Sequence, residues 1–90
     1  MYLHLGQDIV VKSDEIIGIF DLDNTTVKKT TRDYLKKAQK DGKVINVSDE
    51  LPKSFVVCSN DDKDEVYINQ ISSTTLYKRA AFLRKLSVNK

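Results

Sequence analysis

The sequence predicts a small α+β domain, in which an antiparallel sheet of about five or six short strands is accompanied by two amphipathic helices. Three observations favour this class. The chain has 90 residues, enough for one hydrophobic core, and we expect a single domain spanning residues 1–90. Apolar runs of strand length recur along it. Two segments, one starting at Thr30 or Thr31 and one following Ser72-Ser73, instead place apolar residues at helical spacing.

The apolar stretch 15–22 is expected to be the strand around which the others are arranged. Its near-continuous run of strand-prone residues is typical of a strand covered on both faces. Two shorter runs, 2–5 and 9–12, precede it and form a hairpin around Gly6, which can supply a positive φ. A further turn at 12–14 leads into the main strand. The chain is therefore predicted to begin as a three-stranded antiparallel meander.

A helix is predicted from Thr30 or Thr31 to a C-cap at Asp41-Gly42. Asp33 follows Thr30 by three residues, as in a capping box. One side of this helix is predicted to carry Thr31, Tyr34, Leu35 and Ala38.

The opposite side of that helix carries a row of basic residues. Arg32, Lys36 and Lys40 follow each other at i, i+4 spacing, and Lys29 and Lys43 roughly extend the row at its ends. The row is either a solvated face, as most charged helix faces are, or a ridge that contacts phosphates. Like charges at this spacing repel mildly, and no acid alternates with them. A purely structural role therefore explains the row less well.

Three more strands and a helix complete the prediction. Residues 43–47 form a short strand, and Pro52 interrupts pairing before a second strongly apolar strand at 53–59. Residues 65–69 are its hairpin partner, with 60–64 as the loop.

The last helix begins at the N-cap residues Ser72-Ser73 and is amphipathic. Its apolar stripe is expected to consist of Leu76, Ala80 and Leu83, with Phe82 and Leu86 beside it. Its solvent-facing side is expected to carry Lys78, Arg84 and Lys85.

The charge is distributed unevenly, although the formal net charge is only +2. Acids cluster at 14–23 and 61–65, whereas bases cluster at 28–43 and from Lys78 to the end. An anionic partner is therefore expected to meet the helical parts.

Several chemistries lack the residues that they need. A single cysteine, Cys58, excludes an intramolecular disulfide and a cysteine-based metal cage, and we expect it to be a buried small side chain. The lone histidine, His4, has no second histidine or cysteine with which to bind zinc. We expect no cofactor or metal. The sequence shows no signal-peptide pattern and no apolar run of membrane-spanning length, so we expect a cytoplasmic protein without membrane contact.

One catalytic interpretation remains as a third alternative. The string Asp21-x-Asp23-x-Thr25 after an apolar strand resembles the first motif of the haloacid-dehalogenase phosphohydrolases, with Asp21 as nucleophile and Asp23 as acid/base around Mg²⁺. The run 55–60, ending Ser59-Asn60, resembles the second motif of those enzymes. That chemistry uses parallel strands joined by crossovers of a dozen or more residues, for which this chain has no room. We therefore assign no catalytic residue.

Four motifs resemble the Rem family of bacterial extracellular-matrix regulators, and its RemB branch in particular. They are Tyr2-Leu3-His4-Leu5-Gly6-x-Asp8, Ile16-x-Gly18-Ile19-Phe20-Asp21, Lys53-Ser54-x-Val56-Val57 and Ser72-Ser73-x-Thr75-Leu76-x-Lys78-Arg79-Ala80. The order of these motifs and the matching total length make the resemblance specific, and it extends almost from end to end.

The resemblance implies a small protomer that assembles into a homo-oligomeric ring and, in the RemA branch, binds promoter DNA to activate transcription of biofilm-matrix operons. It implies no catalysis. The DNA-contacting arginines of RemA-like proteins correspond here to Ser13-Asp14 and 51–53, where only Lys53 is basic. Candidate contacts to duplex DNA are therefore Lys53, the row Lys29, Arg32, Lys36, Lys40 and Lys43, and Arg79. The alternative is an oligomeric module that modulates another regulator without touching DNA.

Overall fold

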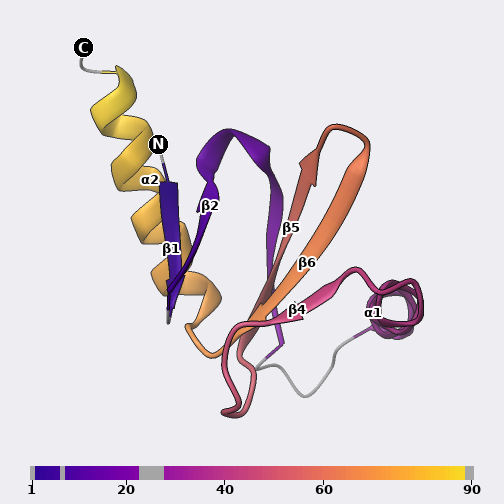
Figure 1. Ribbon diagram of the computed structural model, residues 1–90. Helices are drawn as coiled ribbons and strands as arrows, with labels where there is room; N and C mark the ends of the chain where they lie inside the picture. Colours follow the sequence, from indigo (N-terminus) through magenta and orange to yellow (C-terminus); the bar gives the residue numbers. More distant parts are fainter. Residues whose placement is uncertain (1, 7, 23–27, 89–90) are drawn as a thin grey trace.

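The fold is α+β, as predicted, with elements on both sides of a central sheet (Figure 1). The computed structural model describes residues 2–6, 8–22 and 28–88, and side chains up to residue 82. The elements are β1 (Tyr2–Gly6), β2 (Ile9–Lys12), β3 (Ile16–Asp21), α1 (Lys29–Lys40), β4 (Val44–Asn46), β5 (Ser54–Asn60), β6 (Lys63–Asn69) and α2 (Ser73–Val88).

The described strands form two sheets, so the predicted single antiparallel sheet is corrected. Strands β1 and β2 pair only with each other, and the larger sheet has the order β3-β5-β6-β4. Strand β4 runs parallel to β6, whereas β3, β5 and β6 are antiparallel neighbours. The predicted opening meander is also wrong, because a short 3₁₀ turn at Ser13–Glu15 carries the chain from β2 to the other sheet. The hairpin packs its apolar side onto that sheet and does not extend it.

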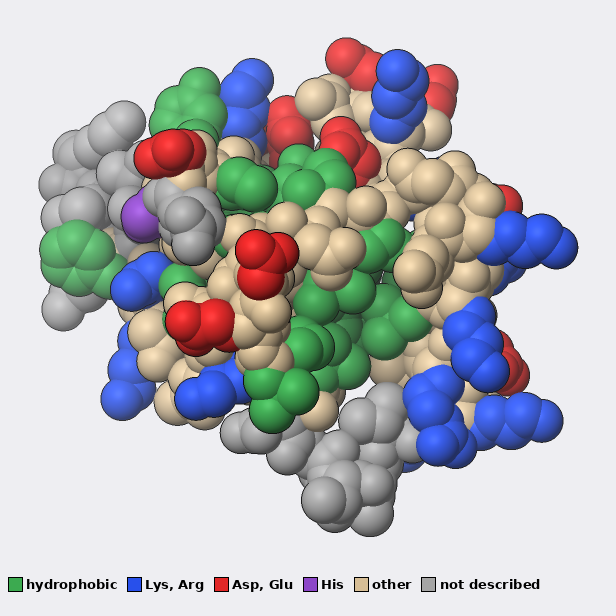
Figure 2. All heavy atoms as spheres, turned by 60° about the horizontal axis from the view of Figure 1, so that its bottom comes forward, with side chains coloured by type: hydrophobic (Ala, Val, Ile, Leu, Met, Phe, Trp, Pro, Cys, Tyr) green, Lys and Arg blue, Asp and Glu red, His purple; other side chains and the backbone are tan. Residues whose placement is uncertain are grey.

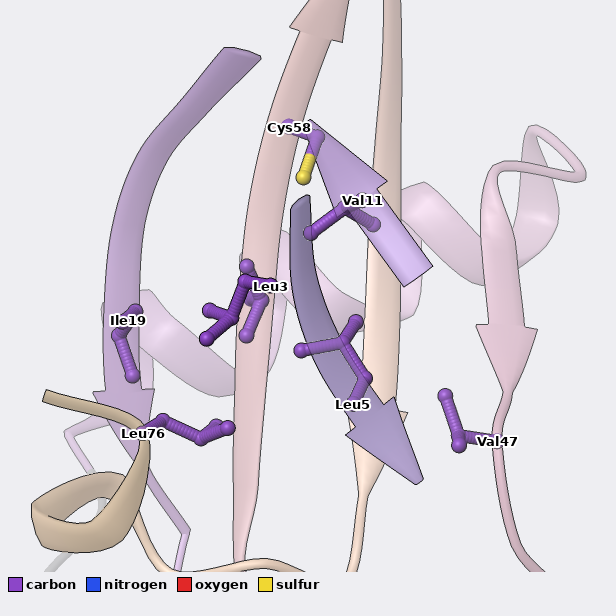
Figure 3. Close-up of a cluster of buried hydrophobic side chains, with 8 residues drawn as sticks. Leu3, Leu5, Val11, Ile19, Val47, Cys58 and Leu76 are labelled. Atoms are coloured by element: carbon purple, nitrogen blue, oxygen red, sulfur yellow. The ribbon is translucent and has the colours of Figure 1, made fainter. Parts of the chain in front are cut away.

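A hydrophobic core, here called the hairpin-side core, fills the space between the β1–β2 hairpin, α2 and the larger sheet (Figure 3). Its buried residues are Leu3, Leu5, Val11, Ile19, Val47, Val56, Cys58 and Leu76. They come from most elements of the fold, and burying such side chains is the main favourable term in folding.

The α1-side core occupies the other face of the larger sheet. It consists of Ala38, Phe55, Val57 and Val66, with Leu22, Leu35, Val44 and Ile68 packed at its border. Helix α1 therefore lies across the sheet from α2 and the hairpin, as Figure 1 shows.

Strand β5, and not the predicted stretch 15–22, is the strand covered on both faces. Residues 54–58 are all buried, because β5 lies between β3 and β6 and beneath both cores. Strand β3 is an edge strand in which only Ile19 is buried, while Ile17 and Phe20 are 63% and 45% exposed. On this edge the Tyr77 hydroxyl of α2 donates a hydrogen bond to the Ile19 carbonyl (2.6 Å).

The ends of the helices agree in part with the prediction. Helix α1 begins at Lys29, and its N-cap, Lys28, makes no side-chain capping bond, so the capping box at Thr30 and Asp33 is wrong. The C-cap is confirmed, since Gly42 has φ +72° and its N–H donates to Gln39 O (3.1 Å). Neither described helix is long and apolar enough to cross a membrane.

The start of α2 is confirmed, because the Thr75 N–H donates to Ser72 Oγ (3.2 Å). Leu76 is fully buried and Ala80 is partly buried, as expected for the stripe, but Phe82 is 62% exposed. The predicted places of Leu83, Leu86, Arg84 and Lys85 lie outside the described side chains.

The β5–β6 hairpin is tighter than predicted. Asn60 pairs with Lys63, so only Asp61 and Asp62 form the turn that was expected to span 60–64. Both have positive φ, 46° and 68°, which is the backbone of a type I′ turn and one that aspartate tolerates better than most residues.

A buried polar contact fixes the start of β5. The Ser54 hydroxyl donates to the Ile71 carbonyl (2.6 Å) and lies 2.9 Å from Asn69 Oδ1. Both Ser54 and Asn69 are almost fully buried. Since buried polar groups are costly without partners, these contacts hold the segment before α2 against the end of β5.

Candidate nucleic-acid interface

Helix α1 presents the predicted basic row to solvent. Arg32, Lys36 and Lys40 are all exposed, and four residues of helix separate successive members by about 6 Å along the axis. Lys29 at the first helical position is exposed as well. Figure 2 shows basic side chains gathered on the right, where α1 lies in Figure 1.

Lys43 is exposed and is held in a fixed position at the end of this row. Its N–H donates to Ala38 O (2.9 Å), and its carbonyl accepts a hydrogen bond from the Val66 N–H (2.9 Å). These two bonds tie the end of α1 to β6. We call Lys29, Arg32, Lys36, Lys40 and Lys43 the α1 row.

The opposite side of α1 is anchored on the sheet. Ala38 is buried, and Leu35 packs against the α1-side core. Tyr34, which was predicted to share this side, stays 42% exposed. The helix is therefore docked through part of its apolar side, which directs the α1 row outward.

The start of α1 departs from the usual chemistry of helix ends. Its first turn holds no acid, Lys28 occupies the N-cap and Lys29 follows it. The positive end of a helix dipole disfavours cations by roughly 0.3–1 kcal/mol each and favours anions. Departures from local rules concentrate at functional sites, and an anion bound near this end would relieve the repulsion.

Lys53 lies at the end of the larger sheet, directly before β5. Its N–H donates to Asn69 O (2.9 Å), and its carbonyl accepts the Leu22 N–H (2.8 Å). The backbone is thus fixed between β3 and β6, while the residue is exposed.

Arg79 lies on α2, across the larger sheet from the α1 row. Its Nη1 donates to the His4 carbonyl (3.1 Å), which joins α2 to β1. The structure therefore does not bring Arg79 together with the α1 row within one protomer. Sequence spacing carries no signal for this separation, because it depends on which face of the sheet each helix covers.

The two phosphohydrolase-like fragments do not meet. Asp21 lies opposite Ser54 in the antiparallel β3–β5 pair, whereas Ser59 lies five residues further along β5. At ~3.4 Å per residue, about 17 Å of strand separates the two positions. Asp23 and Thr25 lie outside the described residues. Within the part of the chain that the structure describes, no three His, Cys, Asp or Glu side chains are grouped to hold a metal.

A polar cleft of about 230 Å³ lies between the hairpin and the sheet, beside Cys58 and Tyr67. Burial, and then the carboxylates of Glu15 and Glu65, raise the pKa of the Cys58 thiol to about 11. Burial and the Glu65 carboxylate also raise the pKa of Tyr67. The prediction of Cys58 as a buried small side chain is confirmed. Its raised pKa disfavours the thiolate, which is the reactive form of cysteine.

Comparison with known proteins agrees with the resemblance seen in the sequence. Residues 2–80 match the RemA-like family, described as "Extracellular matrix regulatory protein A-like". The chain is also 39% identical over 83 residues to "Extracellular matrix regulatory protein B" of Bacillus subtilis (strain 168), a match that covers 92% of this chain and 94% of that protein. The matched range includes the α1 row, Lys53 and Arg79.

Proposed function

The chain belongs to the RemA-like family of extracellular matrix regulatory proteins, and from this premise we propose that it regulates transcription of matrix genes in the cytoplasm as a DNA-binding homo-oligomer without catalytic activity. The observation that carries the proposal is the exposed α1 row. Four of its basic residues lie along α1 and the fifth, Lys43, follows the end of that helix, whose start lacks the acids and the side-chain cap that would stabilise it.

The α1 row is better suited to contact backbone phosphates than to distinguish the base pairs of the nucleic acid. Lysine side chains are flexible point charges, which neutralise backbone phosphates but discriminate little among base pairs. Several weak rows on one oligomer would add their effects through a high effective concentration. Affinity would therefore depend on assembly as much as on any single protomer.

Lys53 is proposed as a further phosphate contact, because its side chain projects from a backbone that two hydrogen bonds fix. Arg79 lies across the sheet and already donates to His4 O, so it does not join the row of its own protomer in this proposal.

The test is equilibrium binding of the protein to duplex DNA over a salt series, with its solution mass measured in the same buffers. An oligomer whose log K falls steeply with log salt supports the proposal, and the slope estimates the number of phosphates neutralised.

A second candidate is an oligomeric module that modulates another regulator without touching DNA. It is favoured by one observation. At the positions where the family resemblance implies basic contacts, this chain carries Ser13, the exposed acid Asp14 and Leu51-Pro52, and only Lys53 is basic. An oligomer that binds no DNA even at low salt would support this second function and contradict the first.

A further inference from the structure

The face of the sheet that α1 covers in part carries an apolar groove, here called the sheet groove. Its walls are Ile17 and Phe20 of β3 and Tyr34 of α1, its floor is Phe55 and Val57, and Asp64 also lines it. The groove encloses about 370 Å³. Ile17 and Phe20 face solvent, although burial of such apolar side chains is favourable.

Side-chain packing fixes one wall of the sheet groove. The rings of Phe20 and Phe55 stack with centroids 4.9 Å apart and planes inclined by 17°. Phe20 also lies over Gly18, where an added Cβ would come within 2.7 Å of its ring. A glycine inside a strand marks a close approach, and here it lets an exposed aromatic ring lie flat on the sheet. The shape is thus set before any partner binds.

A second hollow, here called the hairpin–helix patch, lies between β1 and α2. It is lined by Tyr2, Leu3, His4, Lys78, Arg79 and Phe82 and encloses about 390 Å³. Tyr2 and Phe82 are 59% and 62% exposed. Since β1 and α2 cover the face opposite to α1, this patch and the sheet groove lie on opposite sides of the molecule.

We propose that the hairpin–helix patch of one protomer binds in the sheet groove of the next. This inference deepens the proposed function and rests on its homo-oligomer. The charges of the two surfaces are complementary. Among the described residues, the groove is lined by one acid, Asp64, and no base, whereas the patch is lined by Lys78 and Arg79 and no acid. Opposite charges across an interface favour this pairing and disfavour each surface meeting its own copy.

Contacts between two different surfaces have a distinct consequence for symmetry. A head-to-tail contact uses one groove and one patch per protomer, so it builds a ring when the rotation between neighbours closes. Tyr34 belongs to both the groove wall and α1, so an α1 row lies beside every such interface. The assembly would thereby repeat the basic rows at regular intervals, which the avidity in the proposed function requires.

The experiment measures the solution mass of Ile17→Glu and Phe82→Glu, separately and mixed in equal amounts. Each buried carboxylate should disrupt one surface, so each variant alone should have the mass of one protomer. In the mixture, the intact patch of Ile17→Glu should bind the intact groove of Phe82→Glu, which gives dimers and nothing larger. Both positions are exposed, so circular dichroism should show folded variants.

Leu51→Glu is the matched control, because Leu51 is 82% exposed and lines neither surface. It should keep the mass of the unmodified oligomer. Unchanged oligomers in Ile17→Glu and Phe82→Glu would overturn the inference and leave the proposed function standing. Two monomeric variants that form no dimer when mixed would overturn the head-to-tail pairing. A monomeric unmodified protein would instead overturn the homo-oligomer of the proposed function.

Discussion

Removing two charges from the α1 row should weaken DNA binding and flatten its salt dependence. The variant is Lys36→Gln with Lys40→Gln, and glutamine keeps nearly the helix propensity of lysine. Both residues are exposed and separated by one helical turn, so each can contact one phosphate. Each phosphate contact that is lost makes the slope of log K against log salt shallower by ~0.9, so two lost contacts should make it shallower by about 1.8 per bound protomer. At 0.1 M salt this corresponds to roughly 60-fold weaker binding.

The assay is fluorescence anisotropy of a labelled duplex at salt concentrations between about 50 and 200 mM, the range in which counterion release changes affinity strongly. The control variant, Lys12→Gln with Lys63→Gln, removes the same net charge from exposed positions on β2 and β6. It should keep the original slope. Equal losses in both variants would show that overall charge, and not the α1 row, governs binding. An unchanged slope in the α1 variant would show that these lysines touch no phosphate.

Three further predictions concern stability. Leu76→Ala should lower the free energy of unfolding by about 2–5 kcal/mol, measured by urea denaturation, because Leu76 is fully buried in the hairpin-side core. Gly18→Ala should cost about 1 kcal/mol by displacing the Phe20 ring, and the same change in a Phe20→Ala background should cost nothing; an equal cost in both backgrounds would refute the contact. Because the pKa of Cys58 is about 11 when folded and 9.0 as a free thiol, the unfolded chain ionises first as pH rises. Stability should then fall between about pH 9 and 11, by at most ~2.7 kcal/mol, and Cys58→Ala should show a correspondingly smaller fall in parallel urea titrations.

The sequence was sufficient for the existence of most elements and for the α1 row, but not for the position of β3. Residues 15–22 are apolar enough for a central strand, and such a run is typical of a strand covered on both faces. Strand β5 is the central strand instead. The chain runs from β4 to β5, and β6 then comes back and lies between β4 and β5 in the sheet. This arrangement depends on contacts across the sheet, which local periodicity does not encode.

The sequence could not predict the sheet groove or the separation of Arg79 from the α1 row either. The groove is lined by residues of separate segments, β3, α1, β5 and β6, and no spacing rule connects these segments. The sequence shows that Ile17 and Phe20 are apolar and predicts an interior position for them, but both are exposed. Their exposure follows from the edge position of β3 and from the limited area that α1 covers.

The hydrogen bond from Tyr77 to Ile19 bears on how copies of this chain avoid misassembly. The Leu22 N–H bonds to Lys53 O, and alternation along an antiparallel pair then turns the backbone groups of Ile19 outward from the sheet. An outward carbonyl on an edge strand is a template for another strand, and unguarded edges lead to aggregates that grow without limit. The Tyr77 hydroxyl occupies this carbonyl at 2.6 Å. The Tyr77 side chain thus blocks strand addition at the middle of the exposed edge of β3. Copies of the chain must then associate through side chains and not through backbone pairing at this point.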